Sequence, residues 1–174
     1  DKMRRVATLA AKIARKISGD AKPAKRAAQI AKCDLLSHLV GEFPELQGVI
    51  GRYLALHDGE LAEVANAIAE HYLPRHAGDG LPLTATGQAL AIADKLDTIT
   101  GIFAIGQAPT GDRDPFALRR SALGVLRIMI ECNLDLDLLD LLESSAATFD
   151  KSLKANGIIN TVFEFMMERL RGYY

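Results

Sequence analysis

The sequence has 174 residues, 49% of them apolar, and a formal net charge of −1. This length suits one domain with an appended helix pair, and the apolar content fills a core without disulfides or metals. No apolar run reaches the roughly 18 residues of a membrane span, and the basic N-terminal residues lack the apolar segment of a signal peptide, so we expect a cytoplasmic chain without a membrane partner.

Apolar residues recur with a helical period along almost the whole chain. Asp20 and Asp114-Pro115 are typical helix starts, and Gly19 and Asp58-Gly59 are typical helix ends. The expected helices cover residues 2–17, 22–40, 42–57, 60–73, 86–103, 115–132, 135–148 and 157–171. The sequence therefore predicts an all-α fold, a compact bundle of about eight helices. Residues 1–150 are expected to form the main domain, with its basic N-terminal helix, and residues 151–174 a C-terminal helix.

The small net charge hides a strong asymmetry between two parts of the chain. Residues 1–32 hold ten basic side chains and two acidic ones, whereas residues 34–79 hold eight acidic side chains and two basic ones. Such a division is compatible with a nucleic-acid-binding face. It is equally compatible with a solvated basic helix that lies beside an acidic one, and the charge pattern alone leaves both interpretations open.

Several acids and histidines follow the order of ligands in the HD superfamily of metal phosphohydrolases, to which they show a partial resemblance. Asp34 and His38 share one face of the expected second helix, His57-Asp58 form a doublet, and Asp94 follows in a later helix. In that superfamily, such side chains hold divalent ions that activate water for attack on phosphorus. Here the position of the early histidine of the superfamily falls near Asp34, with His38 one turn later. The His57-Asp58 doublet lies at a helix end, whereas an HD hydrolase has it inside a helix. The alternative is that these acids, with Asp97, cap helices or pair with basic side chains.

The run from Gly101 to Ile128 contains the densest group of arginines. Arg120, Gly124 and Arg127 share one helix face, and Arg119 lies about 100° around the helix. The gap at the glycine would admit a sugar-phosphate backbone or another helix. One interpretation is phosphate binding by these arginines, and the other is an internal network in which Arg119 pairs with Asp94 or Asp97. The apolar residues of this helix are expected to point inward: Phe116, Leu123, Leu126 and Ile130.

Four long blocks span most of the chain: AKCDLLSHLVGEFPELQGVIGRYLALHDGE at 31–60, EHYLPRHAGDGLP at 70–82, ALAIADKLDTITGIFAIGQAPTGDRDPFALRRSALGVLRIMIECNLDLDL at 89–138 and EFMMERLRGYY at 164–174. In content and in order, these blocks resemble the β subunit of bacterial two-subunit glycyl-tRNA synthetase. The resemblance implies an HD-like helical domain at 1–150, within a longer subunit whose anticodon-binding region follows the helix at 151–174.

The same resemblance implies a non-catalytic domain of a glycine–tRNA ligase, which contacts tRNA(Gly) near its acceptor end. The implied partners are the α subunit and the rest of the β subunit, with no DNA. No cofactor or metal is expected here, because ATP and Mg²⁺ bind the α subunit. A metal-dependent phosphohydrolase and a purely structural spacer are the alternatives. The candidate RNA contacts are Arg113, Arg119, Arg120, Arg127, Lys95 and Lys32, with Phe103 and Tyr53 as candidate stacking residues.

Overall fold

The computed structural model describes residues 1–150, 153 and 155–173, and the regular structure of this part of the chain is helical. The helices follow in the order α1 (Lys2–Lys16), α2 (Ala21–Ile30), η1 (Cys33–Leu36), α3 (His38–Glu42), η2 (Pro44–Leu46), α4 (Val49–His57), α5 (Ala62–Glu70), α6 (Ala85–Ala104), α7 (Leu118–Glu131), α8 (Leu138–Ala146), η4 (Ala155–Ile158) and α9 (Ile159–Arg171). The predicted all-α class is confirmed. The expected division after residue 150 falls on Lys151, which lies outside the described residues.

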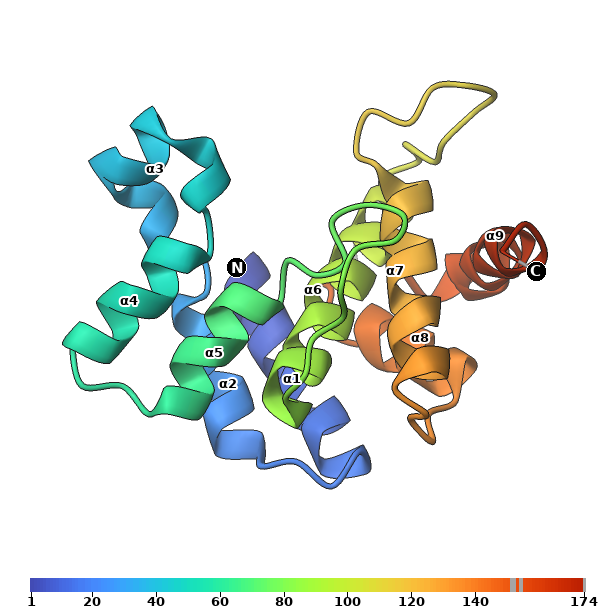
Figure 1. The fold of residues 1–174 in the computed structure, drawn as a ribbon. Helices are drawn as coiled ribbons and strands as arrows, with labels where there is room; N and C mark the ends of the chain where they lie inside the picture. The colour runs from blue at the N-terminus through green and yellow to red at the C-terminus, as the bar shows by residue number, and fades with distance from the viewer. Residues whose placement is uncertain (151–152, 154, 174) are drawn as a thin grey trace.

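Helix α6 forms the centre of the molecule (Figure 1), and α1, α2, α5, α7 and α8 pack against it. Its side chains are buried around most of its circumference, and Leu90, Leu96 and Ile99 have no exposed surface. Alanines dominate the contacts of α1 and α2, where Ala10, Ala14 and the neighbouring alanines are fully buried. Small side chains let helix axes approach closely. Because α6 is packed on most sides, its polar residues, among them Asp94, Lys95 and Asp97, are held in fixed positions.

The helix expected over residues 22–40 is wrong, because α2 ends at Ile30 and the chain turns through η1 and α3. The buried carboxylate of Asp34 stabilises this turn by accepting a hydrogen bond from the N–H of Gly48 at 2.7 Å. Gly48 has a φ of 82°, and a Cβ there would lie 2.7 Å from the ring of Tyr72. Glycine is required for this close approach. The hydrogen bond between Gly48 and Asp34 therefore ends the helix at a point where the local spacing of apolar residues would continue it.

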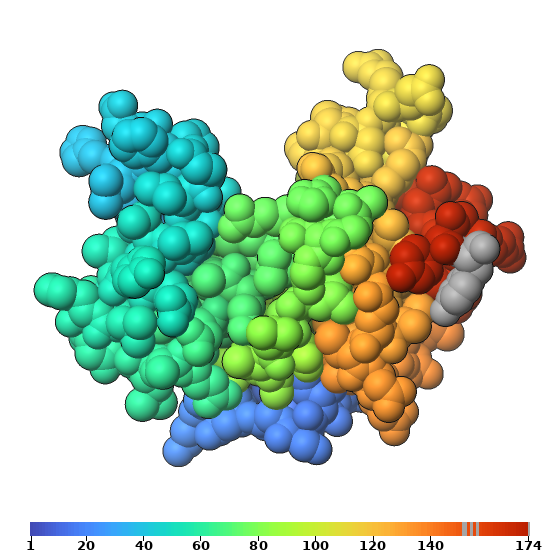
Figure 2. Space-filling model, viewed as in Figure 1, coloured from blue at the N-terminus to red at the C-terminus, as the bar shows by residue number. Residues whose placement is uncertain are grey.

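Two parts of the chain rise from the helical body and leave a notch between them. Figure 1 shows the first around α3, which we call the α3 arm (residues 33–48), and the second between α6 and α7, which we call the α7 loop (residues 105–117). In Figure 2 the surface is hollowed between them. Within the described residues, no helix combines the length and the apolar character that crossing a membrane requires.

Candidate nucleic-acid interface

A cluster of partly buried charged side chains, built around the buried imidazole of His71, lies beneath the notch. The ammonium of Lys32 lies 3.2 Å from the carboxylate of Asp94 and 2.7 Å from Nε2 of His71. Lys2 approaches the other oxygen of Asp94 to 3.0 Å. Nδ1 of His71 lies 2.6 Å from the carbonyl oxygen of Ile68. Both contacts of the imidazole are satisfied when Nδ1–H donates to the carbonyl and Nε2 accepts from Lys32.

Burial governs the charge states in this cluster. Burial, and then the Lys32 charge, lower the pKa of His71 to about 3, so the imidazole is neutral at pH 7. Burial also lowers the pKa of Lys32, and Asp94 opposes this change. For Asp94, burial disfavours ionisation, but Lys32 and Lys2 outweigh it and hold the pKa below its usual range. The single carboxylate of Asp94 thus faces two ammonium groups, those of Lys2 and Lys32, so the cluster carries a net positive charge beneath the notch.

Lys95 adds a further ammonium to the same region. It donates hydrogen bonds to the carbonyl oxygens of His71 at 3.1 Å and Leu73 at 2.8 Å, and burial lowers its pKa to about 8. Its stem crosses α7 at Gly124, where an added Cβ would lie 3.1 Å from Cε of Lys95 and 3.4 Å from Pro74. The gap that the sequence suggested for an RNA backbone or another helix is therefore filled by Lys95 and Pro74.

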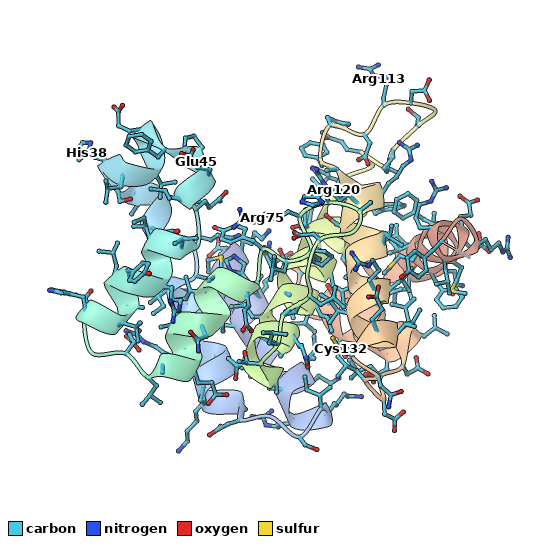
Figure 3. All side chains as sticks on the ribbon, viewed as in Figure 1. His38, Glu45, Arg75, Arg113, Arg120 and Cys132 are labelled. Atoms are coloured by element: carbon cyan, nitrogen blue, oxygen red, sulfur yellow. The ribbon has the colours of Figure 1, made fainter. Side chains whose placement is uncertain are left out.

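Above these lysines a pocket of about 380 Å³ opens, which we call the central pocket. Its lining includes His71, Tyr72, Arg75, Lys95, Phe116 and Arg120. Figure 3 shows Arg75 and Arg120 at the floor of the notch. The guanidinium of Arg75 donates one hydrogen bond to the carbonyl oxygen of Gln47 at 3.0 Å. Arg120 is exposed and has no hydrogen bond or ion pair to any side chain that the structure describes.

The other arginines of this region lie in the α7 loop and in the first turn of α7. Arg113 lies at its exposed tip (Figure 3). The guanidinium of Arg119 donates to the carbonyl oxygen of Gly111, which ties the loop to the first turn of α7. The carboxylate of Asp114 accepts hydrogen bonds from the backbone N–H groups of Leu118 at 2.8 Å and Arg119 at 3.0 Å. Arg113 therefore projects from the tip of a loop that is fixed at its base, and Arg120 projects from the first turn of the helix that follows it.

Arg127 faces the interior, although it shares a helix face with Arg120. Arg127 is only 8% exposed, and its guanidinium lies 2.6 Å from the carboxylate of Glu131. It also donates to the carbonyl oxygen of Asp79 at 3.1 Å. For Arg127 the geometry corresponds to the internal-network interpretation. Of the candidate RNA contacts, Arg113 and Arg120 have accessible, unpaired guanidinium groups, whereas Lys32 and Lys95 contribute charge from beneath.

The residues that follow the HD ligand order do not come together. His38 is exposed on the α3 arm (Figure 3), and His57 and Asp58 lie at the end of α4 with side chains 86% and 76% exposed. Asp34 holds the turn to the α3 arm, and Asp94 is paired with lysines. In the part of the chain that the structure describes, no three His, Cys, Asp or Glu side chains are placed to hold a metal ion. The capping and pairing alternative accounts for Asp34 and Asp94.

The basic helix α1 uses much of its charge inside the protein. Arg5 donates to the buried carboxylate of Asp97 through two N–H groups, at 2.7 and 3.1 Å. Asp97 therefore pairs with α1, and the interpretation in which Arg119 pairs with Asp94 or Asp97 is wrong. Lys16 lies 2.7 Å from Asp140 of α8. The charge asymmetry of the sequence thus corresponds in large part to a basic helix packed beside acidic side chains.

Much of the central pocket does not follow from the sequence pattern. His71, Tyr72 and Arg75 are not among the candidate site residues of the sequence, and Phe116, which was expected to point inward, is 43% exposed. The available signal was the run from His71 to Arg75, in which an imidazole, a phenol and a guanidinium follow a helix within five residues. Their partners are distant in the sequence, so the pattern alone did not show the pocket.

The residues expected to stack on bases lie elsewhere. Phe103 is buried and packs against Phe165, with ring centroids 5.1 Å apart. Tyr53 is 60% exposed, but it lies on α4 and is outside the lining of the central pocket. Phe116 is the exposed aromatic ring of the pocket wall.

Comparison with known proteins gives a consistent result over the whole chain. The family model described as "Glycyl-tRNA synthetase beta subunit" matches residues 1–174. Similar proteins described as glycine–tRNA ligase beta subunits include one from Chromohalobacter salexigens, 54% identical over 99% of this chain and 25% of the relative. Others come from Pseudomonas fluorescens Pf-5, 55% identical over 100% and 25%, and Pseudomonas putida W619, 57% identical over 100% and 26%. The chain spans about a quarter of the length of these relatives.

Proposed function

Because this chain belongs to the glycyl-tRNA synthetase beta subunit family, we propose that it is a non-catalytic, tRNA-contacting domain of a glycine–tRNA ligase. In this proposal it helps to position the acceptor end of tRNA(Gly). The α subunit activates glycine with ATP and Mg²⁺, and the rest of the β subunit supplies the other contacts to tRNA. The chain's own contribution is binding and orientation, since the charged cluster beneath the notch is occupied by internal ion pairs.

The observation that carries the proposal is the group of exposed arginines around the notch. Arg75, Arg113 and Arg120 are exposed, and the guanidinium groups of Arg113 and Arg120 have no partner among the described residues. A guanidinium presents several N–H groups in a plane and binds phosphate oxygens in pairs. The lysines beneath the pocket add positive charge, which favours the approach of a polyanion.

The proposal is tested with charge reversal in the complete ligase, assembled from the full-length β subunit and its α partner. Arg113→Glu and Arg120→Glu are expected to raise the KM for tRNA roughly tenfold each, because each removes a phosphate contact and adds a repulsive charge. Glycine-dependent ATP–pyrophosphate exchange is expected to stay unchanged. Arg15→Glu is the matched control, because Arg15 is exposed in the last turn of α1, on the opposite side of the molecule from the notch (Figure 1).

The same experiment separates the alternatives. An unchanged KM for tRNA in both variants, with a lowered melting temperature, would favour a structural spacer and contradict the proposal. A phosphohydrolase is disfavoured by the separation of Asp34, His38, His57, Asp58 and Asp94. Nucleotide hydrolysis with Mn²⁺ or Mg²⁺ that Asp58→Ala abolishes would overturn that conclusion.

A further inference from the structure

The central pocket combines the size and the charge of a site for a single anionic group. Its volume of about 380 Å³ falls within the roughly 300–1,000 Å³ of small-molecule sites. Arg75, Lys95 and Arg120 line it from three different elements. The carboxylate of Asp94 also lines it, but Lys2 and Lys32 neutralise that charge at 3.0 and 3.2 Å. The pocket is therefore positive even though an acid contributes to its wall.

The cations of the pocket keep hydrogen-bond donors that the protein does not use. An ammonium has three N–H donors, and that of Lys95 spends two of them on the carbonyl oxygens of His71 and Leu73. A guanidinium has five, and Arg75 spends one on Gln47, whereas Arg120 spends none within the described residues. A ligand that satisfies these donors must carry several acceptor oxygens and negative charge. A phosphate group has both properties.

An exposed aromatic ring lies beside these donors. Phe116 is 43% exposed and lines the pocket four residues before Arg120. No aromatic partner covers its ring in the described part of the chain. The ring of Tyr72, in contrast, already packs on His71 at 3.9 Å between centroids and has the Lys32 ammonium 4.0 Å from its centroid. Phe116 is thus the ring that remains available for stacking. A ligand with a flat ring that stacks on Phe116 and a phosphate that binds the neighbouring cations is a nucleotide.

We propose that the central pocket binds one unpaired nucleotide of an RNA strand, with its phosphate on Arg75, Lys95 and Arg120 and its base stacked on Phe116. This inference rests on the proposed function and adds that the bound RNA is single-stranded at this position. Base–aromatic stacking requires an unpaired base, and it tolerates any base because each has a π face. Figure 2 shows the notch open between the α3 arm and the α7 loop, which leaves room for an RNA strand to enter it.

The experiment compares two phenylalanines of similar exposure in the complete ligase. Phe116→Ala is expected to weaken tRNA binding at least about fivefold, because the base loses its stacking partner. Phe43→Ala is the matched control, since Phe43 is 51% exposed on the α3 arm and lies outside the pocket. Arg75→Gln is expected to lower the slope of log Kd against log salt by about 0.7, the value for one phosphate of a single strand. Phe116→Ala is expected to leave that slope unchanged.

A photo-crosslinking residue in place of Phe116 or Phe43 identifies the nucleotide directly. Crosslinks from position 116 to an unpaired nucleotide support the inference, and crosslinks confined to base-paired nucleotides overturn it. If the charge reversals at Arg113 and Arg120 raise the KM for tRNA while Phe116→Ala and Arg75→Gln change nothing, the inference fails and the proposed function stands. If none of the four has an effect, both fail. Tight binding of AMP that depends on Phe116, without tRNA crosslinks, would assign the pocket to a free nucleotide and also overturn the inference.

Discussion

Helix α1 and the segment made of the α7 loop and the first turn of α7 both carry several basic side chains, but they use them in different ways. Lys2, Arg5 and Lys16 of α1 pair with carboxylates of α6 and α8. Arg113 at the tip of the α7 loop and Arg120 in the first turn of α7 are exposed and unpaired within the described residues. The sequence places its largest positive excess in the first 32 residues, whereas the two exposed, unpaired arginines beside the notch, Arg113 and Arg120, come from the second half of the chain. The number of basic residues is therefore a poor guide to a binding surface until their acidic neighbours are known.

The largest expected effect comes from breaking an internal pair of α1. Arg5→Ala removes the partner of Asp97, whose side chain is 3% exposed, and leaves a buried carboxylate uncompensated. We expect the free energy of unfolding to fall by about 3 kcal/mol, measured by urea denaturation. Arg120→Ala is expected to stay within about 0.5 kcal/mol of the unchanged chain, because that side chain is exposed. Equal losses for the two variants would contradict the distinction between paired and available arginines.

A second expectation concerns the pH dependence of the buried cluster. The pKa of His71 is about 3 in the folded chain and about 6.5 when unfolded, so the unfolded chain binds a proton that the folded chain does not. The associated stability is complete above pH 6.5 and is lost as the pH falls. Between pH 6.5 and 4.5 we expect a loss of about 2 kcal/mol in the free energy of unfolding.

His71→Gln is expected to remove that part of the pH dependence. His76→Gln is the matched control, because His76 is an exposed histidine of the neighbouring loop. Urea denaturation of the three chains at both pH values provides the measurement. If His71→Gln leaves the full pH dependence in place, the neutral buried imidazole is not its source.

The smallest expected effect concerns the outer pair of α1. Lys16 and Asp140 have side chains that are 37% and 40% exposed, so solvent screens their attraction. Lys16→Ala should therefore change the free energy of unfolding by less than about 1 kcal/mol. Because its charge lies away from the notch, Lys16→Glu should also leave the KM for tRNA unchanged. A clear increase in that KM would show that α1 also contacts RNA.

Local signals predicted much of the fold. Asp20 caps α2 by accepting from the N–H of Lys22, and α4 ends at His57, directly before Asp58-Gly59, as the sequence indicated. The break after Ile30 was not predictable in the same way, because the hydrogen bond from Gly48 to Asp34 joins residues fourteen positions apart.

The candidate site shows the same limit of local patterns. The sequence named Arg113 and Arg120 as candidate contacts, and the structure leaves both guanidinium groups exposed and without a partner among the described residues. It grouped Arg127 with them, because helix spacing does not reveal that Glu131 and the carbonyl of Asp79 bind its guanidinium. The role of His71 was hidden because its partner Lys32 lies 39 residues away.

Lys95 joins the elements that surround the central pocket, since its ammonium binds the carbonyl oxygens of His71 and Leu73 and its stem lies against Gly124 of α7. The floor of the pocket is thus already ordered before RNA binds, so the protein loses little conformational entropy when RNA binds there. Arg113, at the exposed loop tip, has no such brace among the described side chains. Exposed rim charges act mainly on association rates, and enclosed contacts act mainly on dissociation rates. Under the proposed function, the loop tip would set how often tRNA is captured, and the pocket floor would set how long it stays.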